Sequence, residues 1–202
     1  MLAKELVSEV CPAACSDTTT TGLIIRGVSA AVAGDIISAR QALQEVQAHS
    51  DRKRFAADIL ALEGWIASRE NDWQTVIRTL KPARTRGQQP RVVGRLPVRW
   101  LVAEAYERLG DPEEAAVAYE LVVSPSRLSV WSSLELEYQY VIFYSFAHHR
   151  LVLLYSKMSR VEDARRHWEI FEKTFTNPDP ELVPMIEEAR QALAEAEGKA
   201  AS

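Results

Sequence analysis

The chain is poor in cysteine and has no long apolar run. Its 202 residues include only Cys11 and Cys15, too few for the disulfide framework of a small secreted protein. With no histidine near them in sequence they also lack the four ligands of a structural zinc site. Glu5 and Glu9 interrupt the segment where a signal peptide would be apolar. We therefore expect a soluble cytoplasmic protein, with two ordinary thiols and no cofactor or metal.

The chain also lacks an excess of positive charge and the common catalytic motifs. The net charge is −4, so the chain as a whole does not attract a phosphate backbone, and nucleic acid is not the expected partner. The sequence contains no Gly-x-Ser-x-Gly elbow, no phosphate-binding glycine loop and no His-Glu-x-x-His pair. We expect a protein that is not an enzyme, although Cys11 or Cys15 as a nucleophile is an alternative that a thiol reagent would test.

The clearest pattern in the sequence is an internal repeat. One copy presents a small residue, an aromatic residue, a turn, an alanine and a second aromatic residue at Ala103, Tyr106, Gly110, Ala115 and Tyr119. The apolar positions share one face of a helix on each side of the turn, which predicts a helical hairpin. The equivalents of the first position in the other copies are Gly27, Gly64 and Val152, so that successive copies start 37, 39 and 49 residues apart.

These residues resemble the tetratricopeptide repeat, most fully in the third copy. The resemblance implies an all-α protein, a right-handed α-α superhelix of about four irregular hairpins with capping helices. The expected domain covers residues 21–195, with hairpins near 21–51, 57–87, 96–125 and 133–176 and a capping helix at 179–197. Residues 1–20 are expected to form a cap or a flexible segment, and residues 198–202 a flexible tail.

Some positions depart from the repeat pattern. Arg26 and Glu63 stand where the family has large apolar residues, which suggests distortion in the first two hairpins. A run without proline or glycine from about Trp131 to Met158 predicts one long helix. Residues 91–195 also resemble, loosely, the repeat regions attached to bacterial signalling kinases and transcription regulators. That similarity leaves a regulatory or sensory module as the alternative function.

The resemblance implies a concave surface lined by the first helix of each hairpin, which would bind a peptide or protein partner. The expected contact residues combine aromatic anchors with charges of both signs; they are Trp65, Arg69, Trp100, Glu104, Arg108, His149 and Lys157. Packing of the tryptophans in the core is the competing interpretation. A basic insert forms a second candidate surface, although a solvated loop is favoured there; its residues are Lys81, Arg84, Arg86, Arg91, Arg95 and Arg99.

Two further features leave alternatives open. The aromatic residues of the 131–158 helix cover more than one face, so burial is favoured and homodimerisation through this helix is the alternative. His148 and His149 point about 100° apart on a helix, and neither has an acidic or histidine partner four residues away. His49 and His167 are likewise interpreted as isolated. We therefore expect isolated histidines and no metal site.

Overall fold

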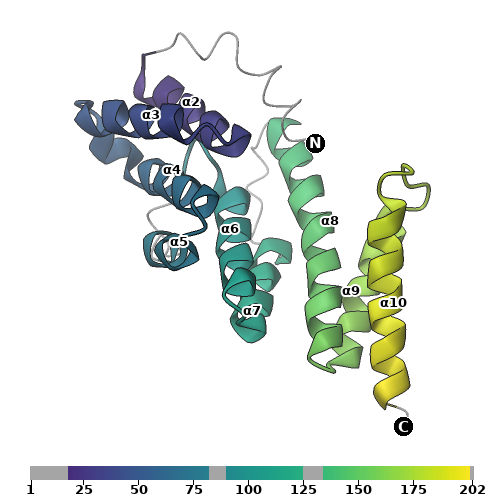
Figure 1. Ribbon diagram of the computed structural model, residues 1–202. Coiled ribbons are helices and arrows are strands. Elements are labelled where there is room, and N and C mark those ends of the chain that lie inside the picture. The colour runs from purple at the N-terminus through teal and green to yellow at the C-terminus, as the bar shows by residue number, and fades with distance from the viewer. Residues whose placement is uncertain (1–17, 82–89, 125–133, 201–202) are drawn as a thin grey trace. The chain divides into compact units, whose positions relative to one another are not determined.

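The computed structural model describes residues 18–81, 90–124 and 134–200, and within these residues it contains helices and no strand. The prediction of an all-α protein is confirmed (Figure 1). The α-helices are α2 (Thr20–Ala33), α3 (Ile36–Ala48), α4 (Ala56–Arg69), α5 (Trp73–Leu80), α6 (Arg95–Arg108), α7 (Pro112–Val123), α8 (Leu134–Lys157), α9 (Val161–Thr174) and α10 (Val183–Ala200), and a short 3₁₀ helix, Arg52–Phe55, precedes α4.

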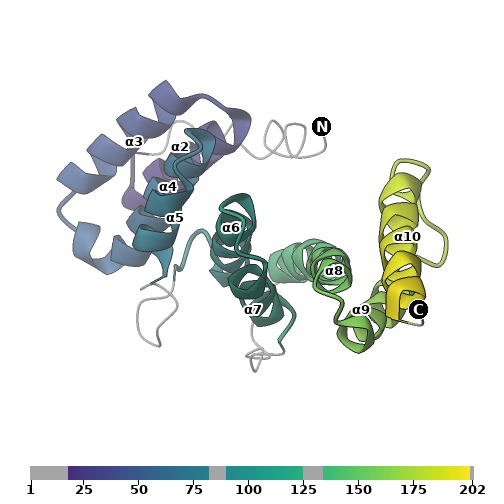
Figure 2. The ribbon, with the colours of Figure 1, turned by 60° about the horizontal axis from the view of Figure 1, so that its bottom comes forward.

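The chain divides into two compact units, with the boundary between Leu109 and Gly110. In unit 1, α2 packs against α3 and α4, α3 packs against α4, and α4 packs against α5 and α6. In unit 2, α8 packs against α7, α9 and α10, and α10 also packs against α9. Figure 2 shows α10 beside α9 from a second direction. The boundary falls inside the third expected hairpin.

Each expected hairpin turn contains one residue with a positive φ. These residues are Gly34 (φ 89°), Asn71 (φ 60°), Gly110 (φ 78°) and Ser159 (φ 58°). The left-handed residue lets the amide that follows it bind back to the last turn of the preceding helix. Asp35 N–H donates to the carbonyl of Ala30 at 2.9 Å, Asp72 N–H to Ala67 at 2.9 Å and Arg160 N–H to Tyr155 at 2.8 Å.

An aspartate follows the left-handed residue in three of these turns and caps the next helix. The carboxylates of Asp35, Asp72 and Asp111 accept from the backbone amides of Ser38, Thr75 and Glu114, at 3.0, 3.0 and 3.2 Å. The first amides of a helix have no partner within the helix, so a capping oxygen at this position fixes where the helix starts. The sequence thus determines both the end of one helix and the start of the next.

Small residues allow close helix contacts in unit 1. A Cβ atom added to Gly27 would lie 2.7 Å from a methyl group of Leu62 on α4 and 3.1 Å from Cβ of Ala42 on α3. One added to Gly64 on α4 would lie 2.7 Å from a methyl group of Leu80 on α5. All three distances are shorter than ordinary van der Waals contact, so a larger side chain at either glycine would force the facing leucine or the helices to shift.

The two polar departures from the repeat pattern pair across helices. Arg26 on α2 forms an ion pair with Glu45 on α3. Glu63 on α4 accepts a hydrogen bond of 2.9 Å from the side-chain amide of Gln47 on α3. Both polar groups therefore have a partner on α3, so neither is left unsatisfied at its helix interface.

In unit 2 the long helix is present, as expected, within residues 134–157, whereas residues 131–133 lie outside the described residues. The capping helix starts and ends later than expected. The carbonyl of Asp179 accepts from the amide of Leu182 at 2.8 Å in a turn, and α10 begins at Val183 with Pro184 in its first turn. Gly198 does not stop the helix, which continues to Ala200, so the expected flexible tail is helical through residue 200.

Candidate functional site

The two expected contact residues of α4 make contacts within unit 1. Trp65 is half-buried and packs against the core cluster that includes Ala31, Leu62 and Ile66. Its Nε1 is buried and has no hydrogen-bond partner among the described residues. The guanidinium of Arg69 donates to the carbonyl of Ala31 at 3.1 Å, a C-terminal carbonyl of α2. It also lies 6.0 Å from the centre of the Trp65 ring, so Arg69 caps α2 while covering Trp65.

The contact residues of α6 are more open. Trp100 is half-buried. Arg108 forms an ion pair of 3.4 Å with Glu104 one turn earlier, and their side chains are 62% and 30% exposed. The Arg108 guanidinium lies 5.7 Å from the centre of the Trp73 ring at the start of α5. Arg108 is therefore held in place by a carboxylate and an aromatic ring while still facing solvent.

His149 does not face solvent, contrary to expectation. It is 4% exposed because α10 and α9 cover this part of α8. Its ring centre is 5.5 Å from that of Phe171, and its Nε2 is 3.4 Å from a carboxylate oxygen of Glu188 without the alignment of a hydrogen bond. Burial lowers the pKa of His149, and the Glu188 carboxylate partly opposes this shift. Lys157 lies at the end of α8 and is exposed, as expected.

The structure shows part of the basic insert. Arg84 and Arg86 lie outside the described residues, and Arg95 is the first residue of α6. The ammonium group of Lys81 lies 5.8 Å from the centre of the Tyr106 ring. Arg99 is half-buried on α6 and Arg91 is exposed.

A buried carboxylate that was missed by the sequence analysis holds the end of this insert. Asp58 on α4 is 1% exposed. One of its oxygens accepts from the amides of Val92 at 2.7 Å and Val93 at 3.1 Å, and the other from the amide of Arg91 at 3.0 Å. Three backbone donors compensate the burial of one charge. Asp58 thus fixes the segment that leads into α6.

In the middle of α8 the described aromatic residues are Phe143, Tyr144 and Phe146, all half-buried, whereas Tyr155 near its end is buried. Trp131 lies outside the described residues, as do the side chains of Tyr138 and Tyr140. The structure therefore bears on the second half of this helix only.

A chain of polar side chains crosses the helices of unit 2, and it corrects the expectation of isolated histidines. Nδ1 of His148 on α8 lies 2.8 Å from Nδ1 of His167 on α9. Nε2 of His167 lies 3.0 Å from Oε1 of Glu120 on α7. Tyr155, also on α8, donates from its hydroxyl to the same oxygen at 2.9 Å, and Arg166 lies 3.5 Å from it. These groups are far apart in sequence, so no local spacing revealed them.

The partners fix the arrangement of protons along this chain. Glu120 is an acceptor, and its hydrogen bond from His167 is the main reason that its pKa is lowered. If both rings are neutral, His167 carries its proton on Nε2 and accepts at Nδ1, so His148 must donate from Nδ1. Nε2 of His148 then carries no proton, and this buried nitrogen has no hydrogen-bond partner among the described residues. His148 and His167 are 2% and 3% exposed.

A second cluster, in unit 1, joins a hydroxyl, an imidazole and a carboxylate. Nδ1 of His49 lies 2.9 Å from the hydroxyl of Thr20 and 2.7 Å from a carboxylate oxygen of Asp51, and the hydroxyl also donates to that oxygen. A base that activates a nucleophile uses one ring nitrogen for the nucleophile and the other for the carboxylate. Here both partners face the same nitrogen, and Thr20 is buried. The geometry suits a structural link between α2 and the segment after α3.

No group of three or more His, Cys, Asp or Glu side chains in the described parts of the chain is arranged to hold a metal ion. None of the described helices combines the length and apolar character that crossing a membrane requires.

The chain matches no protein-family model, no curated protein and no solved structure.

Proposed function

We propose that the chain is an α-α solenoid of the tetratricopeptide type, which binds a peptide or protein partner and catalyses no reaction. The observation that carries this proposal is the recurrence of the left-handed turn residue at Gly34, Asn71, Gly110 and Ser159. Their spacings of 37, 39 and 49 residues equal those of the sequence repeat. One turn geometry at four equivalent positions is expected of repeated helical hairpins.

The packing inside each unit supports the same proposal. In unit 1 the first helices of successive hairpins touch, since α2 contacts α4 and α4 contacts α6. The second helix of one hairpin also packs on the first helix of the next, as α3 does on α4 and α5 on α6. A solenoid grows by these neighbour contacts, which place the first helices side by side on one surface.

That surface is where we place the partner in unit 1. Arg108 supplies an oriented, exposed cation beside the aromatic face of Trp73, and the half-buried Trp100 lies on the same helix as Arg108. Guanidinium groups and aromatic rings are frequent anchors in protein interfaces. Because Arg108 is already held in position, little side-chain entropy is lost when a carboxylate of the partner binds it. Trp65 and Arg69 join α4 to α2 through their contacts with residues of α2.

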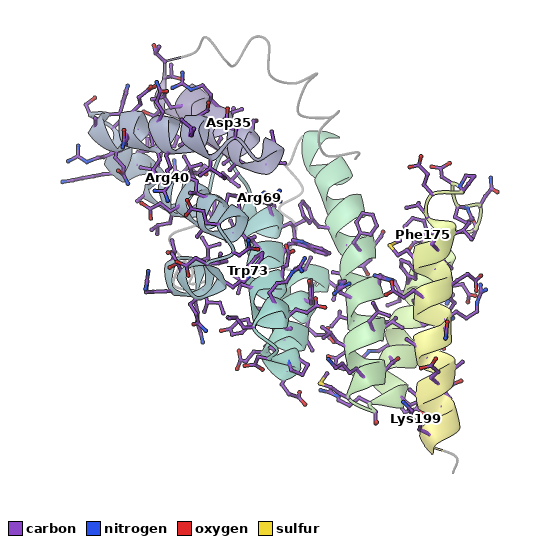
Figure 3. The ribbon with its side chains drawn as sticks, in the orientation of Figure 1. Asp35, Arg40, Arg69, Trp73, Phe175 and Lys199 are labelled. Atoms are coloured by element: carbon purple, nitrogen blue, oxygen red, sulfur yellow. The ribbon has the colours of Figure 1, made fainter. Side chains whose placement is uncertain are left out.

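A pair of charge reversals tests this proposal without disturbing the core. Arg108→Glu changes the first-helix surface, and Arg40→Glu makes the same change on α3, a second helix. Figure 3 labels Arg40 on α3 and Arg69 at the end of α4. The two side chains to be reversed are 62% and 57% exposed, and each forms one ion pair, Arg108 with Glu104 and Arg40 with Glu70. Both variants should therefore fold equally well.

The wild-type chain and both variants serve as bait in a cell extract, and each partner is then purified and titrated against all three. We expect Arg108→Glu to weaken binding about tenfold or more, roughly 1.4 kcal/mol, and Arg40→Glu to have little effect. A partner bound equally by all three proteins would refute the first-helix surface. If no partner binds the wild-type chain, the binding function itself is contradicted.

A further inference from the structure

We propose that the His148–His167–Glu120 chain makes unit 2 sensitive to protons, so that α8 and α9 loosen from α7 in mildly acidic solution while unit 1 remains folded. These three side chains come from three different helices, and the two contacts that join them are 2.8 and 3.0 Å long. Adding a proton to one of these side chains therefore changes the hydrogen bonds between the helices.

The geometry leaves no place for an additional proton. If it binds to His148, it occupies Nε2, because Nδ1 already donates to His167. If it binds to His167 at Nδ1, the 2.8 Å contact requires His148 to accept there and to shift its own proton to Nε2. Both routes place an N–H at Nε2 of His148, which is buried without an acceptor. A buried positive charge and an unsatisfied donor are both costly, so protonation favours an opened state.

Charged and titratable groups surround the histidines from each helix that packs on α8. Glu120 faces them from α7, and Arg166 faces Glu120 from α9 at 3.5 Å. Glu188 of α10 lies 3.4 Å from His149, next to His148 in sequence. Glu120 is the carboxylate that would stabilise a protonated His148, but His167 stands between them.

Groups on α8 and at the start of α9 complete this environment. The ring of Tyr144 lies edge-on to that of His148, with centroids 4.5 Å apart. Tyr155 donates to Glu120, and Arg160, which faces the Tyr155 ring, pairs with Asp163. The positive charge of Arg150 further disfavours a proton on His149. Thus no carboxylate among the described residues hydrogen-bonds directly to His148.

Burial, followed by the neighbouring His167, lowers the pKa of His148 from 6.5 to about 4. Between these values the unfolded chain binds this proton and the folded chain does not, so stability falls as the pH falls. The contribution of His148 is complete above its unfolded pKa and is lost progressively toward the folded pKa. Between about pH 7.5 and 5 the equilibrium constant for opening should rise about 30-fold, or about 2 kcal/mol.

Unit 1 provides an internal comparison. Its one histidine in the sequence is His49, whose side chain is 37% exposed and contacts the Asp51 carboxylate. This imidazole is not buried, unlike those of His148 and His167. Acidification should therefore affect the helices of unit 1 much less than α8 and α9.

Hydrogen exchange of the full chain, resolved by peptide and corrected for the intrinsic pH dependence of exchange, measures opening of each helix separately. The decisive variant is His148→Asn, whose amide nitrogen can replace Nδ1 as the donor to His167 but does not titrate. The matched control is His49→Asn. In the wild-type protein and the control, α8 and α9 should lose about 30-fold or more of their protection between about pH 7.5 and 5. In His148→Asn the protection of α8 and α9 should fall about 30-fold less over the same pH range than in the wild-type protein.

An equal loss of protection in unit 1, or an unchanged loss in His148→Asn, would overturn the proposal. Nuclear magnetic resonance of the wild-type protein gives a test that depends on no variant's stability. The Cε1–H signals of the four histidines are followed while the pH is lowered. We expect the His148 signal to titrate far below its ordinary pKa, or to be lost as unit 2 opens. A His148 signal that titrates near the pKa of a free imidazole while the protein stays folded would refute the proposed proton sensitivity.

Discussion

Removing the carboxylate of Asp58 should destabilise unit 1 more than any surface substitution. This side chain is 1% exposed and accepts from three consecutive backbone amides, those of Arg91, Val92 and Val93. In Asp58→Ala all three donors lose their partner, and the segment before α6 loses its attachment to α4. Since Arg91 is exposed, water can replace the acceptor for its amide, whereas the amide of Val93 is buried.

The size of the effect follows from the number of donors left without a partner. A hydrogen bond to a charged group contributes about 1.5–3 kcal/mol, so two bonds without replacement give about 3–6 kcal/mol for Asp58→Ala. Asp58→Asn retains one acceptor oxygen, which can keep the bonds to Val92 and Val93. Its amide group would then face the Arg91 amide, donor against donor, so we expect a smaller loss of about 2 kcal/mol.

Urea unfolding followed by far-ultraviolet circular dichroism measures both losses. Asp179→Ala, at an exposed position in unit 2, is the control and should change stability by less than about 0.5 kcal/mol. The reasoning fails if Asp58→Ala costs less than about 1 kcal/mol. It also fails if the alanine and asparagine variants are equally unstable, because the retained oxygen would then have no role.

Further substitutions test the close helix contacts and the turns, with thermal or urea unfolding as the measurement. Gly64→Ala should destabilise by about 1–3 kcal/mol because its Cβ would lie 2.7 Å from the buried Leu80 side chain. Gly198→Ala, in a helix with no atom of another segment within 4 Å of the added Cβ, should instead stabilise by up to about 1 kcal/mol. A lower stability of Gly198→Ala would contradict this comparison. Gly110→Ala should cost about 1–2 kcal/mol from backbone strain alone, since its φ is 78° and the space around it is open. Ser159→Gly, at a φ of 58°, should raise stability for the same reason, and a loss there would refute the strain argument.

Local sequence patterns determined the helices and the turns between them. The capping aspartates and the glycines at left-handed positions act within four or five residues, so their effect is the same wherever the helices finally pack. This is why the spacing of the sequence repeat matches the spacing of the left-handed turn residues. The start of α10 was placed too early because Asp179 and Pro180 also suit a turn, which the bond from Leu182 to Asp179 forms instead.

The contact residues were predicted less well than the helices. Arg108 and Lys157 are exposed as expected, but His149 is covered by α10. Whether a helix position faces a partner or a neighbouring helix depends on where the next helix packs, and a repeat pattern does not specify the path of a terminal helix. Arg69 is exposed, but it also binds the carbonyls of Ala31 and Val32 on another helix, which the sequence did not reveal.

By itself the sequence determined an all-helical chain and the positions of its turns, because capping, glycine turns and apolar periodicity act over one or two helical turns. Only the tertiary structure decided that Asp58 binds a segment 33 to 35 residues away and that His148, His167 and Glu120 form one chain. These contacts join separate helices, and their members follow no common spacing. Contacts of this kind depend on how whole helices pack. Helix packing brings side chains together without leaving a pattern in the local sequence.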